Sequence, residues 1–207
     1  MLDIYHAVDA LPGVKKSFIG SGIRYDMLLH RSSDEKTNAS TRSYIRELIV
    51  NHVSGRLKVA PEHTSGETLE MMRKPSFDLF YQFKHIFDEL NEKEALNQQL
   101  IPYFISSHPG CREEDMAELA AITKNLHFKL EQVQDFTPSP MTLATEIYYT
   151  GFHPYTLKPV YTAKTKEEKN AQRLFFFWHQ PQNKPAIVRA LKAINRPDLI
   201  KKLYPKG

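Results

Sequence analysis

Three side chains suited to binding a polar ligand lie close together in the sequence: Lys58, Glu62 and His63. They lie in and just after a short apolar run that predicts a buried strand. The helix that follows is expected to begin with a capping box of Thr64 and Glu67. In parallel α/β folds, ligands bind at the loops after the carboxyl ends of strands. The segment therefore predicts one wall of a ligand site in a parallel α/β fold.

Three other strand-like runs also end in polar, turn-forming loops. These loops are 21–26, which contains Arg24 and Asp26, 106–111, which contains Ser106, Ser107 and His108, and 135–140, which contains Phe136 and Thr137. If all four strands are parallel, the loops meet on one rim and can hold a substrate with carboxylate, amine and hydroxyl groups. Arg24 and Asp26 would grip such groups or pair with each other across a turn, and we favour the pair.

Two reactive side chains lie in the third of these loops. His108 would donate a proton or be a hydrogen-bonded loop histidine, and we favour the second role. Cys111 at a helix start would have a stabilised thiolate, although a lone cysteine is more often inert. A small hydrolase that uses both residues is a further hypothesis. The nine histidines show no ligand spacing such as His-x-x-x-His, so no metal site is predicted within this chain.

The elements that would position these loops alternate along the chain. Strands are predicted at 16–20, 56–60, 99–105 and 129–133, with Pro61 ending the second. Helices are predicted over 2–10, 41–52, 77–90, 112–125, 166–178, 185–194 and 198–204. Because parallel strands need long crossovers, this order favours successive βαβ units. We expect a strand and helix domain over 1–150, and an aromatic linker with basic helices over 151–207.

The first predicted strand, 16–20, would be an uncovered apolar edge, because only the helix 2–10 precedes it. The sequence therefore has the pattern of the later part of a longer fold. We expect the chain alone to be marginally stable, to self-associate, or to cover this edge with residues 2–10.

Composition and charge narrow the class of protein. The 207 residues, 41% of them hydrophobic, can bury one sizeable core. A single cysteine excludes an internal disulfide, and no apolar run is long enough to span a membrane, which suits a cytoplasmic protein. From Lys164 onward, 11 basic residues face three acidic ones, a net charge of +8. This end would dock on RNA or a partner protein, or form a solvated face, and nucleic acid is not favoured.

Six co-linear stretches resemble the radical S-adenosylmethionine (SAM) superfamily, and more closely its uncharacterised YgiQ-like family. They are 11–16 (LPGVKK), 20–26 (GSGIRYD), 55–65 (GRLKVAPEHTS), 73–77 (RKPSF), 103–111 (YFISSHPGC) and 132–142 (QVQDFTPSPMT). Together they extend over nearly the whole chain.

The resemblance implies a fold and two cofactors. Proteins of this superfamily fold as an open barrel of six strand-helix units. A Cys-x-x-x-Cys-x-x-Cys loop after the first strand binds a 4Fe-4S cluster, which reductively cleaves SAM to a 5′-deoxyadenosyl radical. This sequence has no such loop. The resemblance thus implies a parallel partial (β/α) barrel, the last four units, followed by a short helical extension. The cluster ligands would lie in a missing amino-terminal half of the same polypeptide.

The resemblance also assigns site residues and a function. The implied SAM contacts are Lys58 and Glu62 on the fourth strand, Ser106, Ser107 and His108 at the fifth, and Phe136 and Thr137 at the sixth. Arg24 and Asp26 are expected to bind substrate, and Cys111 matches no cluster position. The implied function is part of a radical SAM enzyme of unknown substrate, inactive alone. The alternative is a non-catalytic module that docks RNA or a partner protein through the basic helices.

Overall fold

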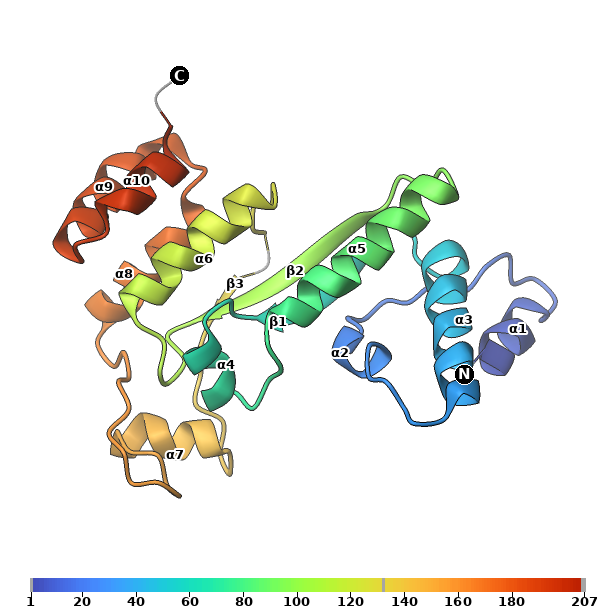
Figure 1. The fold of residues 1–207 in the computed structure, drawn as a ribbon, viewed down its shortest axis with the longest axis horizontal. Helices are drawn as coiled ribbons and strands as arrows, with labels where there is room; N and C mark the ends of the chain where they lie inside the picture. The colour runs from blue at the N-terminus through green and yellow to red at the C-terminus, as the bar shows by residue number, and fades with distance from the viewer. Residues whose placement is uncertain (1, 132, 206–207) are drawn as a thin grey trace. The chain divides into compact units, whose positions relative to one another are not determined.

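The computed structural model describes residues 2–131 and 133–205, which form an α/β protein (Figure 1). The strands are β1 (Arg56–Glu62), β2 (Gln99–Ser106) and β3 (Val133–Asp135). The helices are α1 (Leu2–Asp9), α2 (Tyr25–Leu28), α3 (Glu35–Asn51), α4 (Gly66–Met71), α5 (Asp78–Lys93), α6 (Glu113–Asn125), α7 (Leu143–Thr150), α8 (Lys166–Leu174), α9 (Lys184–Ala193) and α10 (Pro197–Leu203), with 3-10 turns η1 (Phe175–Phe177) and η2 (Pro181–Asn183).

The three strands form one sheet in the order β1-β2-β3. β2 and β3 are parallel, with Phe104 opposite Val133 and Ser106 opposite Asp135. Every second residue of β2 is buried, as expected for a strand in the middle of a sheet. α4 and α5 connect β1 to β2, which is the long crossover typical of a βαβ unit. The α/β class predicted from the sequence is confirmed.

The predicted strand at 16–20 is wrong, because these residues have no strand structure. Other segments bind the backbone and side chain of Ser17 instead: its N–H donates to Asp9 Oδ1 at 2.7 Å, and its hydroxyl lies 3.2 Å from His52 Nδ1. These bonds take the place of the ladder bonds that a strand would make. Among the described residues before α3, the one β-bridge to the sheet joins Ile23 to Val59 in parallel.

Two other strand boundaries shift. β1 continues through Pro61 to Glu62, because the fixed φ of proline is compatible with an extended backbone. The predicted strand 129–133 is displaced to Val133–Asp135, where β3 pairs with the end of β2. Gln132, within that prediction, lies outside the described residues.

Capping side chains explain where the helix predictions err. α3 begins six residues before the prediction because Asp34 accepts the N–H groups of Lys36 and Thr37, both at 3.1 Å. The expected capping box of Thr64 and Glu67 is wrong, since Ser65 caps α4. The helix predicted over 166–178 ends at Leu174 and continues as η1.

The chain divides into two compact units. The first comprises the residues up to Ala60 together with Asp78–Pro102, and the second comprises Pro61–Phe77 together with the residues from Tyr103 onward. These units are a different division of the chain from the predicted domains 1–150 and 151–207. The predicted domains stay a prediction. None of the helices in the described ranges is long and apolar enough to cross a membrane.

Aromatic and aliphatic side chains fill the core of the first unit. α3 contributes the buried Ile45 and Leu48, and α5 contributes Phe83 and Phe87. The ring of Tyr25, from α2, lies 5.6 Å from that of Phe83 between centroids. The helices predicted at 41–52 and 77–90 therefore bury apolar residues in this core.

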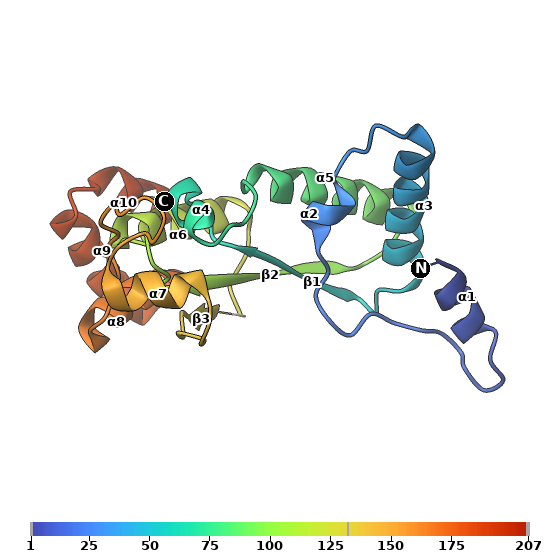
Figure 2. The same cartoon turned by 90° about the horizontal axis from the view of Figure 1, so that it is seen from below.

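Helix α6 is central to the second unit. It packs against α8, η1 and α10, and Figure 2 shows α6 among the helices of this unit. Met116 and Leu119 of α6 are fully buried, as are Phe175 and Phe176 of η1. On its surface Glu118 binds the Arg196 guanidinium at 2.6 Å. Residues before and after position 150 therefore share one core.

Candidate functional site

A pocket of about 430 Å³ lies in the second unit, at the carboxyl ends of the three strands. We call it the strand-end pocket. It is lined by Glu62, Met71, Met72, Arg73, Lys74, Ile105, His108, Phe136, Thr137, Ser139, Thr142, Leu143 and Ala144. Four residues that the sequence predicted as site residues, Glu62, His108, Phe136 and Thr137, thus come together in the fold. The structure adds a wall built from the end of α4 and the start of α7.

Glu62 places a carboxylate at the end of β1. Its backbone has a left-handed φ of 67°, which is uncommon for a side chain other than glycine. The carboxylate lies 3.2 Å from the Lys74 ammonium, and both side chains are largely buried. This ion pair holds the carboxylate in one place at the pocket wall.

His108 and Phe136 form the aromatic part of the pocket. Nδ1 of His108 lies 2.9 Å from the Pro109 carbonyl, so it carries the proton and donates. Burial lowers the pKa of His108 below its ordinary value, which keeps the ring neutral at pH 7. Its Nε2 is therefore a hydrogen-bond acceptor. The Phe136 ring meets the His108 ring edge-on at 4.9 Å between centroids.

A hydrogen-bond chain fixes the ends of β2 and β3. The Ser106 hydroxyl donates to Asp135 Oδ1 at 2.6 Å, and Arg173 donates to the other carboxylate oxygen at 2.9 Å. The N–H of Phe136 donates to the Ser106 carbonyl at 2.8 Å. Ser106 therefore orients the pocket residues, and it is not among the described residues that line the pocket.

Ser107 turns the chain after β2. It is fully buried, has a φ of 61°, and donates its N–H to Gln172 Oε1 at 2.7 Å. Among the described residues, its hydroxyl has no hydrogen-bond partner. It is not among the described residues that line the pocket, so the structure does not make it a pocket contact.

The predicted residues Lys58, Arg24 and Asp26 belong to the first compact unit. The Arg24 guanidinium donates twice to Asp26, at 2.8 and 2.6 Å, which is the mutual pair favoured from the sequence. The side chain of Lys58 is exposed, and its carbonyl accepts the Ile23 N–H at 3.1 Å. The structure does not include these three residues in the described lining of the strand-end pocket.

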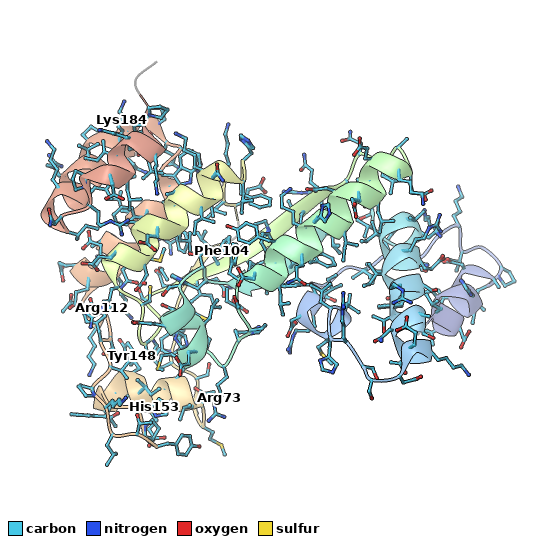
Figure 3. All side chains as sticks on the ribbon, viewed as in Figure 1. Arg73, Phe104, Arg112, Tyr148, His153 and Lys184 are labelled. Carbon is cyan, nitrogen blue, oxygen red and sulfur yellow. The ribbon has the colours of Figure 1, made fainter. Side chains whose placement is uncertain are left out.

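Arg73 and Lys74 line the strand-end pocket but were not predicted as site residues. They follow the end of α4, and the Arg73 guanidinium lies 5.7 Å from the centre of the Tyr155 ring. Figure 3 shows Arg73 near α7, on the same side as His153. The signal was present as two adjacent basic residues before Pro75, but no predicted strand ends there.

Cys111 and His63 form a separate buried cluster. The Cys111 sulfur lies 3.4 Å from His63 Nε2 and 3.2 Å from Gln172 Oε1. Burial raises the pKa of the Cys111 thiol and lowers the pKa of His63 to about 3. Both groups are therefore neutral at pH 7, and Cys111 contacts His63 where the hydrolase hypothesis required His108. The structure gives that hypothesis no support.

His63 supports the loop after β1. Its Nδ1 accepts the Ser65 N–H at 3.0 Å, which leaves the proton on Nε2.

Within residues 2–131 and 133–205, no three His, Cys, Asp or Glu side chains gather as a metal-ligand set.

Comparison with known protein families finds a match over the last third of the chain. Residues 131–203 match a family described as "Domain of unknown function (DUF3362)". That match includes the strand-end residues Phe136 and Thr137 and all helices from α7 onward.

Three relatives are similar over nearly the whole chain. A UPF0313 protein of Bacteroides thetaiotaomicron is 69% identical over 206 residues, which are 100% of this chain and 33% of that protein. A UPF0313 protein of Porphyromonas gingivalis is 60% identical over 206 residues, 100% of this chain and 32% of that protein. A UPF0313 protein of Methanocella arvoryzae is 42% identical over 200 residues, 97% of this chain and 32% of that protein. The chain thus spans about a third of the length of these relatives.

Proposed function

We propose that this chain forms part of a radical SAM enzyme and that the strand-end pocket holds part of SAM. One observation carries the proposal. Glu62, His108 and Phe136 are far apart in the sequence, yet all three line one pocket at the ends of three adjacent strands. These are positions to which the family resemblance assigns SAM contacts.

The chemistry of the pocket suits the groups that SAM carries. Phe136 offers an apolar ring to the adenine, and the neutral His108 offers an acceptor to its amino group. Glu62 offers a carboxylate to the ribose hydroxyls or to the ammonium and sulfonium charges. Arg73 offers a cation to the carboxylate of the methionyl group. A volume of about 430 Å³ is within the usual range for small-molecule pockets.

We further propose that β1, β2 and β3 are the fourth, fifth and sixth strands of a partial barrel. Their order and the helices between them agree with that arrangement. The cluster ligands would then lie in the part of the longer relatives that this chain does not match. Reductive cleavage of SAM is the chemistry that a 4Fe-4S cluster supplies when bound. The residues of this chain bind and orient SAM and exclude water. Because the cluster ligands would lie outside this chain, the chain alone is inactive.

The proposal is tested by measuring SAM binding to the 207-residue chain by isothermal titration calorimetry. Phe136→Ala and Glu62→Gln should each weaken binding by about tenfold, or about 1.4 kcal/mol. The matched control is Phe152→Ala, since Phe152 is an exposed aromatic residue outside the pocket. Absence of SAM binding would contradict the proposal. So would affinities for Phe136→Ala and Glu62→Gln that are as little changed as that of the control Phe152→Ala.

A second test concerns the cluster. The chain should incorporate no stoichiometric 4Fe-4S cluster when it is incubated with iron and sulfide under anaerobic conditions. The Bacteroides thetaiotaomicron relative, treated in the same way, should bind the cluster, and after reduction with dithionite it should release 5′-deoxyadenosine from SAM. A cluster held by this chain alone would refute the proposed division of roles.

The charge of the last helices favours a second candidate function, docking of single-stranded RNA. On α9 and α10, five exposed basic side chains have no ion pair among the described residues: Lys184, Arg189, Lys192, Lys201 and Lys202. The one acidic residue of these helices, Asp198, is already bound to Arg196 at 3.0 Å. The cations are therefore available to phosphate groups.

Fluorescence anisotropy with labelled oligouridylate tests this candidate. Binding should fall steeply with salt, and the double variant Lys201→Glu, Lys202→Glu should reduce the slope by about 1.4, since each phosphate contact on a single strand contributes about 0.7. Lys36→Glu on α3 is the control. Binding that does not depend on salt would count against RNA.

A further inference from the structure

A second pocket, of about 340 Å³, lies within the same compact unit. Three segments form its walls: α4, the turn from Gly110 to Arg112, and the residues 153–161. It shares one lining residue, Met71, with the strand-end pocket. The two pockets are therefore neighbours with almost entirely different linings.

Opposite charges line this pocket without neutralising one another. Glu67 and Glu70 come from α4, and Arg112 and Lys158 come from the other two walls. All four side chains belong to exposed residues, and in the part of the chain that the structure describes none of them forms an ion pair. Opposite charges that share a pocket but remain unpaired are available to a ligand that carries both signs.

Arg112, one of the two cations of this pocket, is held in place by a neighbouring ring. The Arg112 guanidinium lies 5.2 Å from the centre of the Tyr161 ring, a cation–π contact. The Tyr161 carbonyl accepts the Gly110 N–H at 2.8 Å, which fastens the third wall to the turn. Such positioning reduces the entropy that is lost when a ligand binds.

Gly110 fits the wall closely. Its φ is 87°, and a Cβ atom at this position would lie 2.9 Å from Met71 Cγ. The backbone of the turn therefore packs directly on α4, and any other residue here would be strained by the conformation and would have to displace Met71.

His153 adds an N–H donor to the lining. Its Nδ1 lies 3.3 Å from the backbone N–H groups of both Tyr155 and Thr156 and accepts from them. The proton is therefore on Nε2. The pocket thus combines two carboxylates, two cations and a histidine donor.

We propose that this pocket binds a small zwitterion of the amino acid or short peptide class. Its ammonium group lies at Glu67 and Glu70, and its carboxylate lies at Arg112 and Lys158. The methionyl end of SAM carries the same two charges, but we propose that the ligand of this pocket is a different molecule. The assignment rests on this pocket alone and does not depend on the function proposed for the strand-end pocket.

Ligand-observed NMR titration of the chain with glycine, 4-aminobutyrate and 6-aminohexanoate tests the assignment, since this series varies the distance between the two charges. At least one member should bind. Hexylamine and hexanoate, which carry one charge each, should bind about tenfold more weakly. Glu70→Gln and Arg112→Gln should each weaken binding of the zwitterion by about tenfold.

Matched controls are Glu167→Gln and Lys166→Gln, which remove an exposed charge of the same sign elsewhere in the second unit. Both should bind the zwitterion as the unchanged chain does, and SAM should not displace it. Gly110→Ala should abolish binding, with circular dichroism confirming that the variant folds. The assignment is overturned if no zwitterion binds at about 10 mM. It is also overturned if the two single-charge ligands bind equally well, or if SAM competes.

Discussion

Two buried histidines in the second unit use their ring nitrogens in opposite ways. His63 accepts the Ser65 N–H through Nδ1, and its Nε2 faces the sulfur of Cys111 at 3.4 Å. His108 donates through Nδ1 to Pro109, and its ring lines the strand-end pocket. Both rings lie in loops that follow strands. The difference shows that a loop histidine supports the fold when both ring nitrogens contact protein atoms. When only one ring nitrogen contacts protein atoms, the other is available to a ligand.

The largest expected effect comes from removing the histidine that supports the fold. His63→Ala leaves a cavity and an unpaired Ser65 N–H, so the free energy of unfolding should fall by about 2–4 kcal/mol. Urea denaturation measures it, with the exposed His30→Ala as control. A loss below that of the control would break the comparison.

Acidification should weaken the fold through the same residue. Burial lowers the pKa of His63 from 6.5 to about 3, so between these values the unfolded chain binds a proton that the folded chain does not. The stability that the neutral ring contributes is therefore full above pH 6.5 and is lost as the pH falls toward 3. One such group changes the free energy of unfolding by at most about 1.4 kcal/mol per pH unit.

Urea titrations between neutral and acidic pH measure this slope. His63→Gln should flatten it, because glutamine takes up no proton in this range. His108 also has a lowered pKa and would retain part of the slope. An unchanged slope in His63→Gln would assign the effect to other groups.

A smaller effect is expected at the turn between the two pockets. Gly110→Ala introduces a side chain at a φ of 87° and against Met71, which should lower the free energy of unfolding by about 1–3 kcal/mol. Gly20→Ala is the control, since a Cβ there meets nothing within 4 Å. Equal stability of both variants would show that Met71 moves aside.

The smallest effect is expected in the first unit. Arg24→Ala breaks an exposed ion pair, so the melting temperature and SAM binding should both remain within experimental error. Calorimetry measures both. A loss of SAM binding would restore Arg24 to the ligand site.

Periodicity and capping explain which parts of the fold the sequence could predict. The helices at 41–52 and 77–90 were recognisable from apolar residues such as Leu48 and Phe83, which the structure buries. The strand at 16–20 was not, because the bonds that Ser17 makes to Asp9 and His52 depend on distant residues. Short apolar runs carry too little periodicity to reveal such competition.

The candidate site was predictable only where its residues follow strands. Glu62, His108 and Phe136 do so, and a strand-end argument finds them. Arg73 and Lys74 reach the same pocket from the end of a short helix, and that approach is set by how α4 packs. A pattern along the chain contains no such information.

The left-handed backbone of Glu62 and Ser107 limits what evolution can place at the ends of β1 and β2. With φ values of 67° and 61°, both positions exclude β-branched residues such as valine, isoleucine and threonine, while glycine, asparagine and aspartate remain compatible. Variation among relatives should therefore be narrow at these two positions even where the neighbouring surface changes freely. The substitutions tolerated there would record the geometry of the turns, independently of any ligand.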